Sequence, residues 1–331
     1  MSKTEHTGGR VLLALGVLLA ALFVLSFCLG RMGWTPAPPA GFCCSPLLPL
    51  EPTWTDHEYT AVMNIRLPRH RSGLPGGVLP VQAPGRPTRG CFRIPWPSPD
   101  VLGASSGASF GAALAILAGV GNQGTTLSAF FWSLATVVLV YLVGQRAPGD
   151  RVLNLVLAGM VISSLFTAAT SYLKLVADPT SQLPEITYWL MGSLSGTRLA
   201  DVARIAPAMA AGLFPLFLLR WKLNLLTLGD DEARAMGVNA PRLRFLTVVC
   251  ATLVTAASIA VSGMIGWVGL VVPHLCRKLV GSNFRVLLPC SMLAGAAFLL
   301  LVDNLSRNLL ATEIPIGILT AFTGAPFFLL I

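Results

Sequence analysis

Apolar stretches of nearly membrane-spanning length recur along the chain and are separated by short polar segments. A helix that crosses a bilayer needs about 20 apolar residues. Eight windows reach or approach this length: 11–30, 102–120, 127–144, 152–176, 205–219, 243–262, 286–301 and 314–331. A ninth run, 264–272, is shorter and would need its flanks to cross. The pattern predicts an all-α polytopic membrane protein.

The composition agrees with this fold class. Of the 331 residues, 54% are hydrophobic and only 11% are charged, which is unusual for a soluble domain of this size. The first window follows a basic start, but its apolar core is too long for a signal peptide and no small-residue cleavage site follows closely. We therefore expect 11–30 to be a retained first helix and 1–331 to form a single transmembrane domain.

The Lys and Arg residues between the windows predict the orientation. They form three clusters: Arg146 and Arg151; Arg220, Lys222, Arg234, Arg242 and Arg244; Arg277, Lys278 and Arg285. Cytoplasmic loops carry such an excess, so the net charge of +9 indicates orientation rather than nucleic-acid binding. All three clusters lie inside only if one span lies between Arg69 and Asp100 and another between Ser262 and Arg277. This predicts ten helices, with both termini cytoplasmic.

Three arginines fall on the outer side of this topology: Arg66 and Arg69 in "IRLPR", and Arg307 in "DNLSRNLL". Each could be an interfacial residue whose charged head reaches the membrane surface. Together they would also form a positive cluster that suits an acidic docking partner. Both interpretations remain open at this point.

The longest hydrophilic interior loop reads "LTLGDDEARAMGVNAPRLR". Thr227, followed three residues later by Asp230, resembles a capping pattern, and further acids follow at once. Gly237 suits the end of a helix. The loop is either a plain connector or, as we favour, a short cytoplasmic helix that docks a partner. On the outer side, 183–196 carries Tyr188 and Trp189, which predicts a short helix at the interface.

No catalytic or metal-binding motif is present in the sequence. There is no GxxxxGK[ST] phosphate-binding loop, and the four histidines and seven cysteines lack metal-ligand spacing. We therefore predict no enzymatic activity and no cofactor. Asp303 is an intramembrane acid without a second acid for a proton relay, so a helix-packing role is favoured. The small residues of 102–113 predict close helix packing, although a pore wall would look similar.

Several strings resemble the permease subunits of FecCD-type ABC importers, which take up iron-siderophores, haem and cobalamin. They are "IRLPR", "SPDVLGASSGASFGAALAI", "LAGMVISSLFTAATSYL", "YWLMGSLSG", "LGDDEARAMGVN", "GMIGWVGLVVPHLCRKLVG" and "LLVDNLSRNLLATEIPIGILTAFTGAPFFLL". They occur in the family's order and spacing, at about 51–69 and almost continuously over 98–331. The specificity of the resemblance comes from the number of strings that agree.

The resemblance implies a ten-helix homodimer in the bacterial inner membrane, two ATPase subunits on the cytoplasmic side and a substrate-binding protein on the outer side. Arg66, Arg69 and Arg307 match the outer arginines that pair with acids of the binding protein. The segment matching the ATPase coupling loop comprises Leu228, Gly229, Asp230, Asp231, Glu232, Ala233, Arg234, Met236 and Gly237. These assignments agree with the roles suggested by charge and capping.

The chain departs from the family at 70–97. Ser72 to Trp96 holds five prolines, five glycines and three arginines, where the family has a small-residue second helix. "QAPGRPTRGCFRIPWP" can be back-translated so that a displaced frame reads Gly, Ala, Gly, Ala, Ala, Tyr, Gln, Gly, Met, Phe, then Ser or Pro, Asn, Pro, Leu, Ala. This is the family's missing motif. We infer a segment translated out of frame, with a true hydrophilic insertion as the alternative.

Two other functions compete with an importer permease. One is a secondary transporter or channel that works without an ATPase. The other is a non-functional permease remnant, because of the damaged second helix. The transported metal chelate is not determined by these motifs.

Overall fold

The computed structural model describes residues 3–28, 102–146, 148, 151–226, 230–310 and 312–329. Within these residues the chain forms eleven helices and no strand, which confirms the all-α class. The helices are α1 (Lys3–Cys28), α5 (Ala104–Leu117), α6 (Gly121–Arg146), α7 (Arg151–Val176), α8 (Gln182–Leu190), α9 (Leu199–Leu226), α10 (Asp230–Ala235), α11 (Ala240–Ser262), α12 (Val268–Val280), α13 (Phe284–Asn308) and α14 (Ile316–Leu329).

Six of these helices are long and apolar enough to cross a membrane: α1, α6, α7, α9, α11 and α13. Helices α5, α12 and α14 also fall on predicted spans, but they have only 14, 13 and 14 residues. Nine of the ten predicted crossings therefore have a corresponding helix. The tenth, at 70–97, lies outside the described residues, as do 29–69.

Two predicted helices have different bounds in the structure because left-handed backbone interrupts them. The run predicted at 264–272 is helical only from Val268, since Gly263 and Trp267 have φ angles of 66° and 69°. The short helix predicted at 183–196 is α8, which ends at Leu190, and Gly192 follows with a φ angle of 70°. A right-handed helix cannot continue through such residues.

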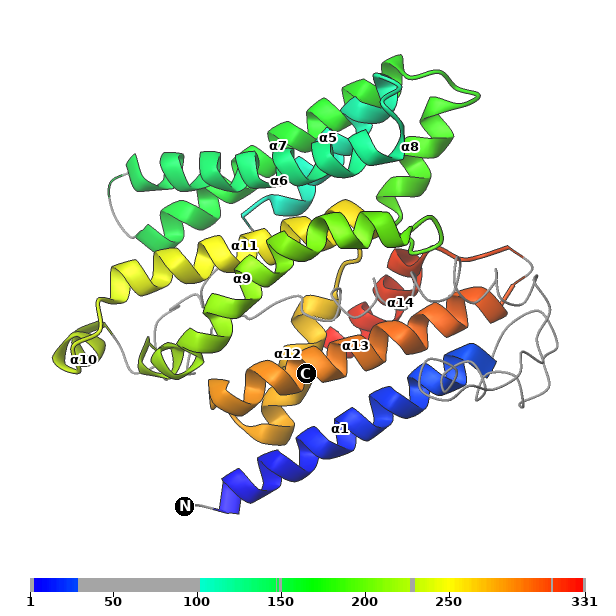
Figure 1. Cartoon of the computed structure of the whole chain (residues 1–331). Coiled ribbons are helices and arrows are strands. Elements are labelled where there is room, and N and C mark those ends of the chain that lie inside the picture. The colour runs from blue at the N-terminus through cyan, green and yellow to red at the C-terminus, as the bar shows by residue number, and fades with distance from the viewer. Residues whose placement is uncertain are drawn as a thin grey trace.

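The long helices run side by side, so the connecting segments collect at the two ends of the bundle (Figure 1). Helix α5 packs on α6 and α7, α11 packs between α6 and α9, and α13 packs against α12 and α1. Helix α1 lies at one edge of the bundle beside α13 (Figure 1). We call one end of the bundle the basic end. It carries α10 and the last turn of α6, and all three Lys and Arg clusters lie there. The end of the bundle that carries α8 is called the opposite end.

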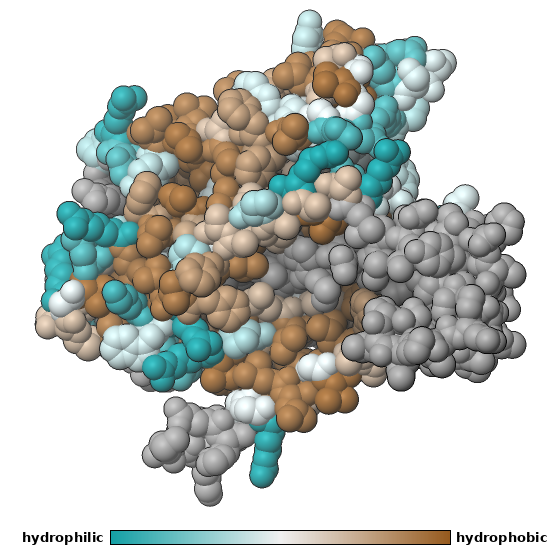
Figure 2. Space-filling model, viewed as in Figure 1, coloured by the Kyte–Doolittle hydropathy of each residue, from teal (hydrophilic) through white to brown (hydrophobic). Residues whose placement is uncertain are grey.

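The lateral surface is strongly apolar, as a bilayer requires. Leu157, Val161 and Leu165 on α7 are 47%, 70% and 65% exposed. In the space-filling view, hydrophobic residues cover the middle of the visible face, and hydrophilic ones gather toward the ends (Figure 2). An exposed apolar belt of this kind is stable against lipid but not against water.

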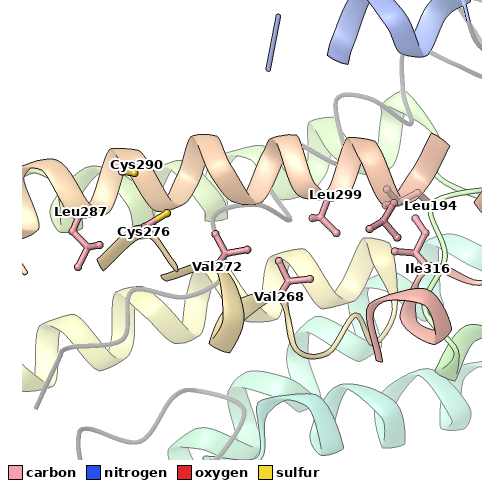
Figure 3. Close-up of a cluster of buried hydrophobic side chains, with 9 residues drawn as sticks. Leu194, Val268, Val272, Cys276, Leu287, Cys290, Leu299 and Ile316 are labelled. Atoms are coloured by element: carbon pink, nitrogen blue, oxygen red, sulfur yellow. The ribbon is translucent and has the colours of Figure 1, made fainter. Parts of the chain in front are cut away.

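The interior is built by close helix contacts. Val272 and Cys276 of α12 face Leu287 and Cys290 of α13 in a buried cluster, to which Leu194 and Ile316 add from neighbouring segments (Figure 3). On the other side of the bundle, a Cβ atom added at Gly111 of α5 would lie 2.6 Å from the Ser128 carbonyl oxygen of α6. The small residues of 102–113 therefore serve helix packing, as predicted.

Candidate partner-docking surfaces

The predicted short helix at the basic end is α10, which lies between the end of α9 and the start of α11. Its last turn is closed by hydrogen bonds from the Gly237 N–H to the Arg234 carbonyl (2.9 Å) and from the Val238 N–H to the Ala233 carbonyl (2.9 Å). Gly237 has a φ angle of 78°, the left-handed conformation that glycine adopts without strain. The sequence prediction that the helix stops at this glycine is thus confirmed.

Helix α10 is anchored on one side and exposed on the other. Ala233 is fully buried, and Val238 packs on the buried cluster of Leu223, Leu243 and Phe284. Asn239 then caps α11, because its side-chain oxygen accepts a hydrogen bond from the Arg242 N–H at 3.1 Å. This arrangement holds α10 firmly against the bundle.

The outward side of α10 presents polar and flexible side chains to the space beyond the basic end. Glu232 and Arg234 are exposed, and Met236 is 48% exposed. Side chains of this kind, on a short anchored helix, suit contact with a partner protein better than burial in lipid. Thr227, Leu228 and Gly229 lie outside the described residues, and only the backbone of Asp230 and Asp231 is described.

At the opposite end, Arg307 lies in the last turn of α13 and is held by a compact polar network. Its Nη2 donates to Ser26 Oγ (2.8 Å) and to Asn304 Oδ1 (2.8 Å), and it pairs with Asp303 Oδ2 at 3.1 Å. Ser26 Oγ in turn donates to Asn304 Oδ1 at 2.9 Å. The network therefore joins α1 to α13.

The network is largely withdrawn from the surface. The side chains of Arg307 and Asp303 are 12% and 2% exposed, and Ser26 is fully buried. Asp303 is the ion-pair partner of Arg307 within α13 itself, whereas Arg307 and Asn304 make the hydrogen bonds to Ser26 of α1, so the predicted helix-packing hydrogen bond of Asp303 stays a prediction. The sequence reasoning missed Ser26 and Asn304, and no local pattern could have found this pair, because 278 residues separate them.

Arg307 accordingly combines a structural role with a position at the opposite end of the bundle. Arg66 and Arg69, the other two arginines of the predicted docking cluster, lie outside the described residues. Their proximity to Arg307 and the docking role of all three stay predictions.

Comparison with known proteins gives consistent matches along almost the whole chain. The FecCD transport family matches residues 18–331. The molybdate import system permease protein MolB of Haemophilus influenzae is 37% identical over 96% of this chain and 94% of its own length. The hemin transport system permease protein HmuU of Yersinia pestis is 37% identical over 81% of each chain.

A solved structure described as an inward-facing conformation of a metal-chelate type ABC transporter has the same architecture. It matches with a TM-score of 0.82 and 36% identity, over 97% of each chain.

Proposed function

Since the chain belongs to the FecCD transport family and is a multi-pass permease subunit of the ABC importer type, we propose that it imports an iron-siderophore or a related metal chelate that a binding protein delivers. ATP hydrolysis takes place in separate ATPase subunits. Relatives whose names specify molybdate and hemin are equally similar at 37% identity, so overall similarity does not select the substrate. The relatives' names therefore support the class of cargo, and transport assays must identify the compound.

The observation that carries this proposal is the anchored and exposed helix α10 at the basic end. An importer that draws energy from a separate ATPase needs a rigid element that transmits the movement of that subunit into the membrane. Buried Ala233 and the cap at Asn239 supply the rigidity, and Glu232, Arg234 and Met236 supply the contact. We propose that 228–237 docks the ATPase, with the basic end cytoplasmic in a bacterial inner membrane and both termini on that side.

The opposite end would then receive the binding protein, and two copies of the chain would form the transporter with two ATPase subunits. Arg66, Arg69 and Arg307 are the residues that we propose to pair with acidic side chains of the binding protein. Charge pairs of this kind mainly steer encounter and fix the docking register.

Reconstitution in proteoliposomes tests the proposal. We expect the genes of the ATPase and the binding protein to lie beside that of the permease, and the three proteins should together give ATP-dependent uptake of one compound from a panel of iron-hydroxamates, ferric citrate, haem, cobalamin and molybdate. Reversing Asp231 and Glu232 to Lys should abolish uptake, whereas Asp178→Lys, the reversal of one acid at the opposite end, should not. Uptake driven by a proton gradient without the ATPase would instead establish a secondary transporter.

We also propose that 70–97 is translated out of frame, which bears on whether the chain as written transports at all. A segment so rich in proline, glycine and arginine would leave backbone groups unpaired in hydrocarbon, at several kcal/mol each. Resequencing the gene, or restoring the displaced frame, should yield a Gly/Ala-rich helix that ends in "YQG" and "NP" motifs and should recover uptake. If neither alternative frame encodes these motifs, the stretch is a true insertion.

A further inference from the structure

Basic side chains gather where α12 ends and α13 begins. Arg277 and Lys278 lie in the last turn of α12, and Arg285 is the second residue of α13. The short connection 281–283 between these helices is exposed, as are Lys278 and Arg285. Three positive charges therefore flank one short connection at the basic end of the bundle. We call Arg277, Lys278 and Arg285 the hairpin cluster.

The positive charge of the hairpin cluster is not balanced within the hairpin that α12 and α13 form. None of the three residues forms an ion pair with a described residue. The segment 268–302 contains no Asp or Glu. The next acid, Asp303, lies about 27 Å farther along α13 than Arg285, at 1.5 Å per residue. The cluster can therefore accept an external anion without competing with an acid of its own hairpin.

Arg285 occupies a position that is unfavourable for a cation. The N-terminus of a helix carries the positive end of the helix dipole, so an acid there stabilises the helix and a cation does not. The first turn of α13 contains no acid. Asn283 caps the backbone, because its side-chain oxygen accepts a hydrogen bond from the Arg285 N–H at 3.0 Å, but this neutral amide leaves the charge of Arg285 in place. An anion near the connection would offset that charge and would also interact favourably with the helix end.

The hairpin cluster lies at the border of the apolar lateral surface. Lys278 follows Leu275 by three residues, so the two side chains share a face of α12. Leu275 is 38% exposed, and Leu279, next to Lys278, is 58% exposed. Exposed leucines beside an exposed lysine are typical of the level at which hydrocarbon gives way to lipid headgroups.

Helix α1 adds a positive charge at the same border. It packs on α13, and a Cβ atom added at Gly8 would lie 3.0 Å from Val286 Cγ1, directly after Arg285 in the sequence. Arg10 is exposed and begins a helix face that continues with Leu13 and Val17, which are 71% and 62% exposed. Two neighbouring parts of the bundle thus show the same sequence of a basic residue followed by exposed apolar ones.

We propose that the hairpin cluster binds the phosphate group of an anionic phospholipid in the leaflet at the basic end. Arginine and lysine are the side chains that bind phosphate most strongly, and basic residues at the membrane surface favour anionic lipids. The exposed leucines beside the cluster would contact the acyl chains of the same lipid. This inference does not depend on the proposed transport function.

A protein partner is less suited to this surface. Helix α10, the proposed contact for the ATPase, packs on α9 and α11, and it lies apart from the connection between α12 and α13 (Figure 1). The exposed Leu275 and Leu279 continue the lateral surface that faces the bilayer. A lipid accounts for both the charge and the apolar neighbours of the cluster.

Native mass spectrometry of the full chain tests the proposal. The purified chain in a mild detergent is titrated with phosphatidylglycerol, which is anionic, and in parallel with phosphatidylcholine, which has no net charge. The unaltered chain should bind phosphatidylglycerol saturably and at least about 10-fold more tightly than phosphatidylcholine. Equal affinity for the two lipids would overturn the proposal.

Variants of the cluster localise the site. The triple variant Arg277→Gln, Lys278→Gln and Arg285→Gln should lose the preference for phosphatidylglycerol. The double variant Lys278→Gln with Arg285→Gln changes exposed side chains only, so it keeps the test valid if the triple variant does not fold, and it should lose most of the preference. A double variant that is folded and binds phosphatidylglycerol as the unaltered chain does would overturn the proposal.

A control variant distinguishes a site from net charge. Arg146→Gln, Lys222→Gln and Arg242→Gln together remove three exposed positive charges of the basic end that lie on α6, α9 and α11. This variant has the same net charge as the triple cluster variant and should keep the preference for phosphatidylglycerol. An equal loss in both would show a general effect of charge and overturn the assignment. If the cluster variants instead keep the lipid but lose the ATPase in a pull-down, the surface docks that protein and the proposal is wrong.

Discussion

Replacing Asp303 with Leu should destabilise the bundle strongly, because it removes the counter-charge of Arg307. The two side chains are 2% and 12% exposed and lie 3.1 Å apart, so water screens the pair poorly. Breaking a buried pair by removing one partner typically costs about 3–5 kcal/mol. Arg307 would keep its hydrogen bonds to Ser26 and Asn304, both at 2.8 Å, which places the expected loss near the lower limit, about 3 kcal/mol.

Asp303→Asn separates charge from hydrogen bonding. The amide keeps an acceptor for Arg307 but loses the charge, and a charge-assisted hydrogen bond contributes about 1.5–3 kcal/mol, so this variant should lose less than Asp303→Leu. The double variant Asp303→Leu with Arg307→Met removes both charges and should recover most of the loss, since apolar replacement of a buried pair is often neutral.

The assay is unfolding of the purified chain by SDS titration in mixed micelles, monitored by circular dichroism. The reasoning is refuted if Asp303→Leu stays within about 0.5 kcal/mol of the unaltered chain, the range typical of surface changes. It is also refuted if the double variant is as unstable as the single one, because the loss would then not come from an unpaired Arg307.

Three further variants test other parts of the structure. Gly237→Pro should abolish uptake without dissociating the dimer, because proline cannot adopt the φ angle of 78°. An uptake assay measures transport and cross-linking measures the dimer. Retained uptake would contradict the coupling role. Gly317→Ala should lower stability by about 1–3 kcal/mol, because the added methyl would clash with the Met191 carbonyl oxygen and lie 2.8 Å from the Met264 carbonyl oxygen. Gly16→Ala meets open space inside α1 and should be neutral or slightly stabilising, so a thermal midpoint of Gly317→Ala no lower than that of Gly16→Ala would refute the packing argument. The double variant Arg307→Gln with Asp303→Asn, which leaves no unpaired buried acid, should weaken binding-protein docking at low salt and reduce its salt dependence, as surface plasmon resonance would show, and unchanged affinity would remove Arg307 from the docking site.

The sequence by itself determined the class and most of the helices. The length of an apolar run and the bilayer thickness are enough to predict a crossing, because every backbone group in hydrocarbon must be paired within its own helix. For this reason the predicted windows 127–144, 152–176 and 243–262 all fall within α6, α7 and α11. The position where α10 ends could also be predicted from the local sequence, because a glycine in the left-handed conformation stops a helix.

Tertiary structure decided the features that join distant segments. The start of α12 at Val268 depends on left-handed backbone at Gly263, where the chain passes close to Gly192. The hydropathy pattern does not predict this close contact between distant segments. Likewise, Asp303 is an isolated acid in the sequence, and only the packing of α1 on α13 brings Ser26 to its ion pair. Local patterns encode which segments become helices, whereas the partners of a polar side chain depend on which helices pack together.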